Sequence, residues 1–258
     1  MLTLLEKLYP PREAESRKAL RKFLDSITSG LEAEITITGK NERNWVQVEV
    51  QGPDAKVATN YLRKKIGVAT SLEEIVLPMT LRGKIVDSGR VGYGLYVDIS
   101  LNNNGVVDIL VPLHKLRSHL VDGSKLPLRE IGRLFCLYDN FPFSVRLTKV
   151  EVEGKKVWGE PSDTQVEFFR KWVSAGLDRV IILGASDERV AYAIERSGIR
   201  RDIVAVDILG FLEHSLCCKL GTDAPGIIKL LGTYLPRVPL CAFSPRKIRE
   251  AMGTLPSS

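Results

Sequence analysis

Cysteine and histidine are scarce in this chain, and neither is arranged as a metal site. The 258 residues include four cysteines and three histidines, and no two cysteines stand in C-x-x-C spacing. Cys217 and Cys218 are adjacent, a spacing that ordinary zinc sites do not use. We therefore expect reduced and mostly buried thiols, no metal and no cofactor.

Long hydrophobic runs and glycine-rich nucleotide motifs are also missing. No apolar stretch approaches the roughly 20 residues that cross a bilayer. The amino-terminal residues lack the basic head, apolar core and cleavage site of a signal peptide. Residues 183–187, LGASD, contain one glycine instead of G-x-G-x-x-G, and no P-loop spacing with its lysine occurs. We expect a cytoplasmic protein with no membrane partner.

The composition that remains is typical of a multidomain α+β protein. Hydrophobic residues make up 44% and charged residues 26% of the chain, and its length allows two or three small domains. We divide it into residues 1–78, 79–158 and 159–258. These ranges predict an N-terminal α-β-β-α unit, a central five-stranded OB-type β-barrel and a small C-terminal α/β domain.

The N-terminal unit is predicted from two helical patterns that flank a hairpin. Residues 13–30 have apolar positions at helical spacing, residues 31–39 and 44–52 alternate like strands, and residues 53–67 form a second helical pattern. The order is weakly similar to a KH-type RNA module. However, the G-x-x-G loop that clamps nucleotides in that module is not present, so a packing or partner-binding domain is the alternative.

The central barrel is predicted from short strands separated by glycine and asparagine turns. Residues 81–87, 91–100 and 106–111 suggest an antiparallel meander with turns at SGR and at NNNG, residues 102–105. Residues 113–120 have helical spacing, and residues 133–139 and 141–154 supply two further strands. Five strands with a short helix after the third outline an OB-type barrel.

A resemblance to a known family rests on the same segment. Gly83, the run Tyr93-Gly94-Leu95-Tyr96-Val97-Asp98-Ile99, and Leu110-Val111 followed by Leu116 resemble the RNA-binding OB domain of the ribosomal-protein-S-one type. The likeness covers residues 81–154 and implies RNA binding. Pro112 and His114 depart from the family pattern, which bears on the RNA contacts more than on the fold. The three-part layout of the whole chain also resembles a family of uncharacterised archaeal proteins.

Two tyrosines carry the predicted stacking surface. Tyr93 and Tyr96 are three residues apart, so they share a face only if the strand bulges, and Gly94 between them would allow a bulge. Exposed rings on an OB surface can stack on unpaired bases. The alternative is that one or both rings fill the barrel.

Basic side chains of the same region are predicted to contact phosphates. Residues 81–160 carry 12 Lys or Arg against 9 Asp or Glu, in a chain of net charge +6, and a basic surface suits RNA. A solvated basic rim is the structural alternative. The predicted contacts are Arg82, Lys84, Arg90, Lys115, Arg117 and Arg146.

The C-terminal third is predicted to contain a parallel β-α-β unit. Residues 178–185 and 202–210 read as buried strands on either side of a helix, and residues 211–221 read as a further helix. An enzyme that uses Ser186, Asp207 or His214 is the least favoured function. We expect instead a non-catalytic protein of translation or transcription that binds single-stranded RNA. The main alternative is a protein adaptor that docks on the ribosome or RNA polymerase.

Overall fold

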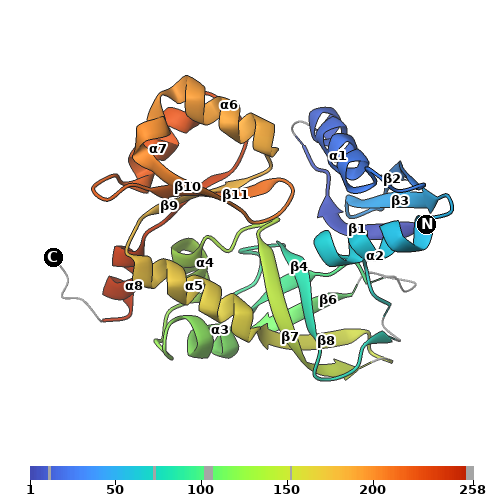
Figure 1. The fold of residues 1–258 in the computed structure, drawn as a ribbon. Coiled ribbons are helices and arrows are strands. Elements are labelled where there is room, and N and C mark those ends of the chain that lie inside the picture. Colours follow the sequence, from blue (N-terminus) through green and yellow to red (C-terminus); the bar gives the residue numbers. More distant parts are fainter. Residues whose placement is uncertain (11–12, 72–73, 102–106, 152, 254–258) are drawn as a thin grey trace. The chain divides into compact units, whose positions relative to one another are not determined.

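The computed structural model describes residues 1–10, 13–71, 74–101, 107–151 and 153–253. The chain divides into two compact units, Met1–Ile75 with Ile99–Val106, and Val76–Asp98 with Val107–Ser258. Together they make a multidomain α+β protein (Figure 1). Within the described ranges, no helix combines the length and the apolar composition needed to cross a bilayer. The predicted turn at residues 102–105 lies outside these ranges.

The first unit is a three-stranded antiparallel sheet with two helices. The strand order is β1-β3-β2, and the core includes Leu20, Leu24, Val48 and Leu62, all 0% exposed. The predicted helices and hairpin are present, but the prediction missed the first strand. Helix α1 leads directly into β2. The elements are β1 (Leu2–Lys7), α1 (Glu13–Ile27), β2 (Glu34–Lys40), β3 (Trp45–Gln51) and α2 (Ala55–Lys65).

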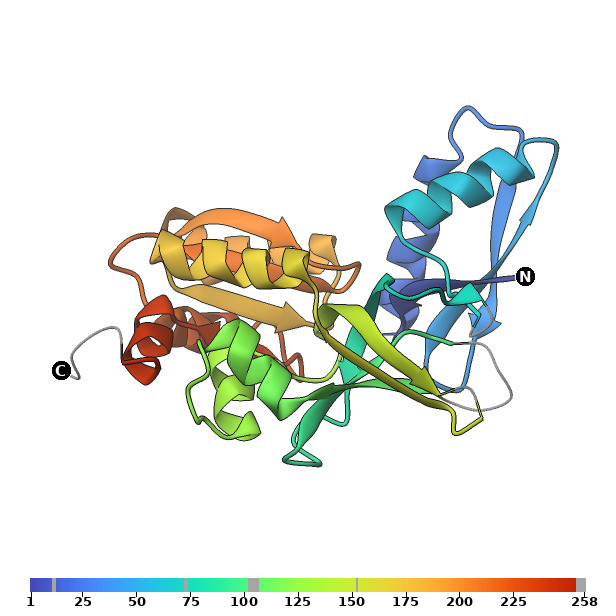
Figure 2. The ribbon, with the colours of Figure 1, turned by 90° about the horizontal axis from the view of Figure 1, so that it is seen from below.

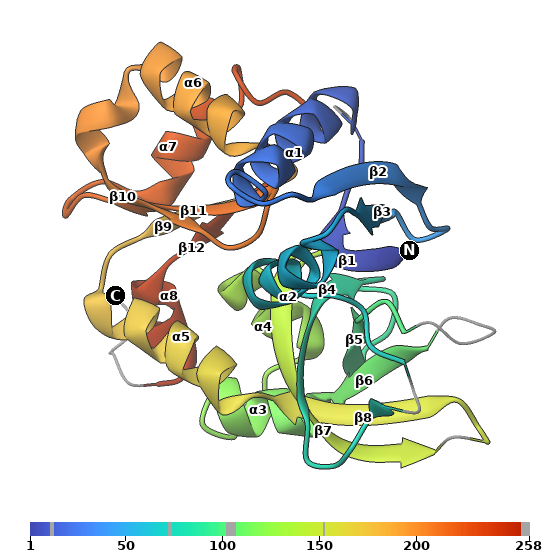
Figure 3. The same ribbon diagram turned by 45° about the vertical axis from the view of Figure 1, so that its right-hand side comes forward.

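The second unit begins with the predicted barrel, which closes in the order β4-β5-β6-β8-β7. Strands β6 and β8 pair in parallel and the other pairs are antiparallel. Alternate residues such as Val97, Ile109 and Val145 point inward and are 0% exposed. Figure 3 shows the five strands together. They are β4 (Thr80–Val86), β5 (Gly94–Asp98), β6 (Asp108–Pro112), β7 (Pro142–Glu151) and β8 (Lys156–Pro161).

One predicted barrel strand is wrong. Residues 133–139 do not form a strand, because their first part closes helix α4 (Leu128–Phe135). Leu128, Ile131 and Leu134 follow Pro127 at helical spacing and are buried. The fifth strand is β8, beyond the segment that was expected to supply it. The predicted helix after the third strand is confirmed as α3 (Leu113–Leu120), and α3 and α4 lie together at one end of the barrel (Figure 2).

The C-terminal part contains a four-stranded sheet in the order β10-β11-β9-β12, with antiparallel pairing throughout. Helices α6 and α7 cover one face, and α4, α5 and α8 lie on the other (Figure 1). The strands are β9 (Arg179–Leu183), β10 (Ile203–Ile208), β11 (Glu213–Cys218) and β12 (Leu240–Phe243). The helices are α5 (Asp163–Ala175), α6 (Asp187–Ser197), the 3-10 helix η2 (Ile199–Asp202), α7 (Ala224–Leu231) and α8 (Pro245–Ala251).

The prediction that the two parallel strands are neighbours in the sheet is therefore wrong. Strands β9 and β10 point the same way, because each is antiparallel to β11, but β11 lies between them. The segment 211–221, expected to be a helix, contains this central strand. All six residues of β11 are buried, which follows from its position between two strands and two helical layers.

Candidate nucleic-acid interface

Tyr93 and Tyr96 lie together on the outside of the barrel. Their hydroxyl oxygens are 2.8 Å apart, and their ring centroids are 6.4 Å apart with an interplanar angle of 84°. The Tyr93 side chain is 58% exposed. Tyr93 precedes the first residue of β5 and is therefore not bound by the alternation of that strand. The hydrogen bond between the two hydroxyl groups is the largest cause that raises the pKa of Tyr96.

Gly94 is needed for close packing of strands. A Cβ atom there would lie 2.6 Å from Leu110 Cδ1 and 2.7 Å from the Val111 carbonyl oxygen. Any side chain at this position would push β5 away from β6. Gly94 therefore fixes the start of β5, and with it the position of the neighbouring tyrosines.

Tyr96 belongs to a row of apolar side chains that crosses three strands. In the register of the barrel, Tyr96 on β5 pairs with Leu110 on β6, and Leu110 pairs with Trp158 on β8. All three are partly exposed, whereas Val157 beside Trp158 is buried at 2% exposure. We call Tyr96, Leu110 and Trp158 the outer row. The prediction missed Trp158 because the predicted barrel ended at this residue. Its signal in the sequence is the neighbouring pair Val157 and Trp158, whose side chains point to opposite faces of a strand.

Cations flank both ends of the outer row. Arg90 is exposed on the β4–β5 loop, where it pairs with Asp87 at 3.1 Å, and its charge slightly opposes the rise in the pKa of Tyr96. At the other end, Lys149 Nζ lies 5.0 Å from the centroid of the Trp158 ring. Lys149 also pairs with Glu151. Arg90 was predicted as a phosphate contact, and Lys149 was not.

Arg82 and Lys84 do not join this surface. They share a face of β4 as predicted, but that face is directed at the C-terminal part of the same unit. Lys84 is 2% exposed, and its Nζ lies 2.9 and 2.8 Å from the carboxylate oxygens of Glu213. Arg82 donates a hydrogen bond to the Leu209 carbonyl oxygen. The prediction that Lys84 faces phosphates is corrected, because its ammonium is buried in an ion pair.

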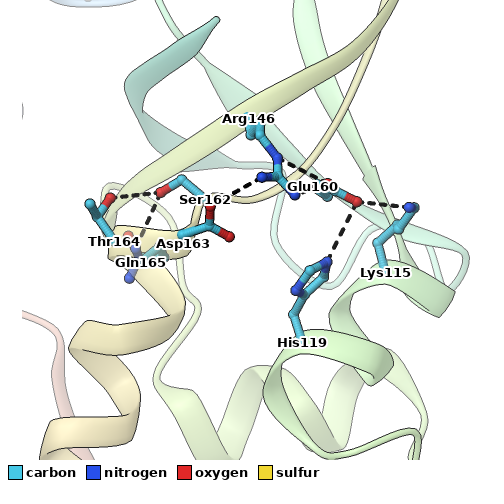
Figure 4. Close-up of polar contacts among 8 residues, drawn as sticks. All are labelled: Lys115, His119, Arg146, Glu160, Ser162, Asp163, Thr164 and Gln165. Atoms are coloured by element: carbon cyan, nitrogen blue, oxygen red, sulfur yellow. Dashed lines mark hydrogen bonds and ion pairs between the residues drawn. The ribbon is translucent and has the colours of Figure 1, made fainter. Parts of the chain in front are cut away.

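Lys115 and Arg146 converge on one carboxylate instead of lining an open path (Figure 4). Lys115 Nζ lies 2.7 Å and Arg146 Nη2 2.6 Å from the carboxylate of Glu160, and His119 Nε2 lies 3.5 Å away. Arg146 also pairs with Asp163 at 3.1 Å. The pKa of Glu160 falls from 4.5 to about 2, with the hydrogen bond from Lys115 as the largest cause. This group, the Glu160 cluster, ties α3 to β7 and β8.

Arg117 is also held by the protein. Its Nε donates to the Leu126 carbonyl oxygen at 2.8 Å, which fixes the loop between α3 and α4. Of the six predicted cations, the structure thus brings only Arg90 near the tyrosines. The other five contact acidic side chains or carbonyl groups of the barrel and of the C-terminal part.

The three side chains considered for an enzyme do not assemble into one site. Ser186 is the N-cap residue of α6. Asp207 pairs with Arg179 at 2.5 Å, and His214 is 0% exposed. Asp207 pairs in register with Ser215, the neighbour of His214, so Asp207 and His214 point to opposite faces of the sheet. No group of three or more potential metal-binding side chains occurs in the part of the chain that the structure describes.

Three family models match the chain in sequence order. The DUF2110 N-terminal domain matches residues 1–71, the DUF2110 central domain matches residues 78–173, and the DUF2110 C-terminal domain matches residues 177–242. The central match spans the barrel and most of α5. The likeness of residues 81–154 to the ribosomal-protein-S-one type remains a sequence resemblance. No curated protein matches the chain.

Proposed function

This chain belongs to the DUF2110 family, and we propose that it is a non-catalytic protein that binds single-stranded RNA on the outer row of its barrel. One observation carries the proposal. Tyr96, Leu110 and Trp158 are register partners on three adjacent strands, and all are accessible. The strands β5 and β6 are the second and third of an OB-type barrel, whose shared face is a common site for oligonucleotides.

The spacing of the outer row suits unpaired bases. Adjacent strands lie about 4.8 Å apart, so Tyr96 and Trp158 are separated by about 10 Å across β6. Two bases that stack on these rings would each contribute roughly 1–3 kcal/mol. Tyr93, 58% exposed beside Tyr96, extends the aromatic surface. Stacking of this kind does not require a particular sequence.

Phosphate contacts are fewer in this proposal than the sequence predicted. Arg90 and Lys149 flank the outer row, and the other predicted cations are held elsewhere. Two phosphate contacts on single-stranded RNA correspond to a log–log salt slope of about −1.4. We therefore propose binding that depends more on stacking than on charge, in a cytoplasmic setting of translation or transcription.

Fluorescence anisotropy with a labelled single-stranded RNA tests the proposal. The double variant Tyr96→Ala, Trp158→Ala should lower affinity by about 30-fold or more, because the two lost stacks together contribute roughly 2 kcal/mol or more. Tyr192→Ala removes an aromatic ring on α6 that is 52% exposed and lies outside the barrel, and it is the control for the loss of a surface ring. Equal affinity for the double variant and the wild type would show that the outer row is not the site.

The adaptor alternative predicts a different outcome. If the barrel docks on a protein of the ribosome or RNA polymerase, co-purified partners should survive ribonuclease treatment, and labelled RNA should not bind. In that case the double variant Tyr96→Ala, Trp158→Ala would reduce only the amount of partner protein that co-purifies.

A further inference from the structure

A cleft of about 250 Å³ lies on the side of the barrel formed by β4 and β7, away from the outer row. Strand β7, helix α5 and the end of β10 contribute its walls. Its apolar lining includes Phe141, Pro142 and Phe168, and its polar lining includes Arg82, Ser144 and Gln165. All of these residues belong to the second compact unit.

Gln165 presents a hydrogen-bond donor to this cleft. The residue is 7% exposed, and its Oε1 accepts a hydrogen bond from the Ser144 backbone N–H at 3.0 Å. That bond fixes the orientation of the amide, so the Nε2 amino group is directed away from Ser144. No described residue accepts a hydrogen bond from this amino group. A donor held in this orientation can bond a ligand that supplies an acceptor.

Arg82 adds a positive charge that no described carboxylate neutralises. Its Nη2 donates to the Leu209 carbonyl oxygen, and the other guanidinium donors have no acidic partner within the described ranges. The residue is exposed at the edge of the cleft. A guanidinium in this state suits a phosphate or a carboxylate.

An aromatic ring completes the lining. Phe168 is partly exposed, and its ring is supported by Trp172, with centroids 4.2 Å apart. A planar group can pack against such a ring. The cleft therefore combines an aromatic surface, an amide that donates hydrogen bonds and a cation.

We infer that this cleft binds one nucleoside monophosphate, with the base against Phe168 and the phosphate at Arg82. Because Gln165 offers a donor, the site should favour bases with a carbonyl oxygen, such as uracil and guanine, over adenine, which has none. The nucleotide could be free in solution or be the terminal nucleotide of an RNA strand. The inference does not rest on the outer row, because different strands form the two sites.

Isothermal titration of the full chain with UMP, GMP, AMP and inorganic phosphate tests this inference. We expect saturable binding of UMP and GMP in the range of micromolar to millimolar Kd, with AMP about 10-fold weaker. Gln165→Glu keeps the acceptor for Ser144 but replaces the donor, and should weaken UMP binding at least 10-fold. Arg82→Gln removes the charge and should weaken it similarly. Melting curves of both variants check folding.

The controls separate this site from the proposed RNA surface. The double variant Tyr96→Ala, Trp158→Ala should bind UMP as the wild type does. Short RNAs with and without a terminal phosphate distinguish the two sources of the nucleotide. Tighter binding of the phosphorylated RNA would identify the ligand as the end of an RNA strand. Equally weak binding of both RNAs would identify the ligand as a free nucleotide. Absence of saturable nucleotide binding, or binding of inorganic phosphate as tight as UMP and unaffected by Gln165→Glu, would overturn the inference.

Discussion

Lys84 on β4 and Glu213 on β11 form an ion pair that is closed to solvent. Lys84 Nζ lies 2.8 Å from Glu213 Oε2, and the two side chains are 3% and 0% exposed. Gly210 packs against the carboxylate so closely that a Cβ atom there would lie 2.2 Å from Oε2. The pair therefore joins the barrel to the C-terminal sheet, and a side chain at position 210 would have to displace the Glu213 carboxylate.

Removal of one partner should be costly. Lys84→Met leaves the Glu213 carboxylate buried without its ammonium partner, a change that typically costs about 3–5 kcal/mol. The double variant Lys84→Met, Glu213→Leu should recover much of that loss, because the Glu213 carboxylate is removed together with its ammonium partner. Urea denaturation of the wild type, both single variants and the double variant measures the coupling. Additive losses would show that the two side chains act independently.

The sequence predicted most strands and helices because their patterns are local. The hairpin of β2 and β3, the meander of β4 to β6 and the helix α3 each follow from alternation or helical spacing within a few residues. Helix α4 was misread because the apolar period that defines it begins at Leu128, before the segment that looked like a strand. The fifth strand was then placed one segment too early.

Positions that depend on distant partners could not be predicted. Glu213 and His214 are polar yet 0% exposed, and Lys84 is 129 residues from Glu213 in sequence. A helical pattern therefore seemed the better explanation of residues 211–221. For the same reason five of the six basic residues were predicted to contact phosphates. Their true partners, such as Glu160 for Lys115 and Arg146, become neighbours only when the barrel closes.

The Glu160 cluster should make stability depend on pH in the acidic range. The folded pKa of about 2 is below the ordinary 4.5, so the ionised carboxylate stabilises the fold above pH 4.5. That stabilisation is lost as pH falls from 4.5 to about 2, and its upper limit is about 3 kcal/mol. Glu160→Gln should reduce stability at neutral pH, and the difference from wild type should shrink over this window. Unfolding curves at several pH values measure it, and a constant difference would contradict the assignment.

Gly159 should tolerate no side chain. A Cβ atom there would lie 2.2 Å from Val145 Cγ1 and 2.9 Å from the Arg146 carbonyl oxygen, so Gly159→Ala must separate β8 from β7. We expect a loss of about 1–3 kcal/mol, typical of overpacking, seen as a lower melting temperature. Gly92→Ala is the control, because nothing lies within 4 Å of a Cβ atom at that position. Equal melting temperatures for the two variants would mean that the strands adjust freely.

Cys241 should be the most reactive thiol. A hydrogen bond from Cys136 lowers the pKa of Cys241, while the same bond and burial raise the pKa of Cys136. Burial raises the pKa of Cys218 to about 12. The thiolate is the reactive form, so iodoacetamide at about pH 8 should label Cys241 first, as read by peptide mass spectrometry.

The partner thiol provides the check on this order. Cys136→Ala removes the hydrogen-bond donor, so the Cys241 pKa should rise and its labelling should slow at neutral pH. Cys218→Ala removes a buried thiol that is not a cause of the Cys241 shift and should leave the Cys241 rate unchanged. In the wild type the rate should increase as pH rises through the lowered pKa of Cys241, because the thiolate fraction increases there. If Cys241 is labelled as fast in the Cys136→Ala variant as in the wild type, burial and access govern its reactivity instead of the hydrogen bond between the two thiols.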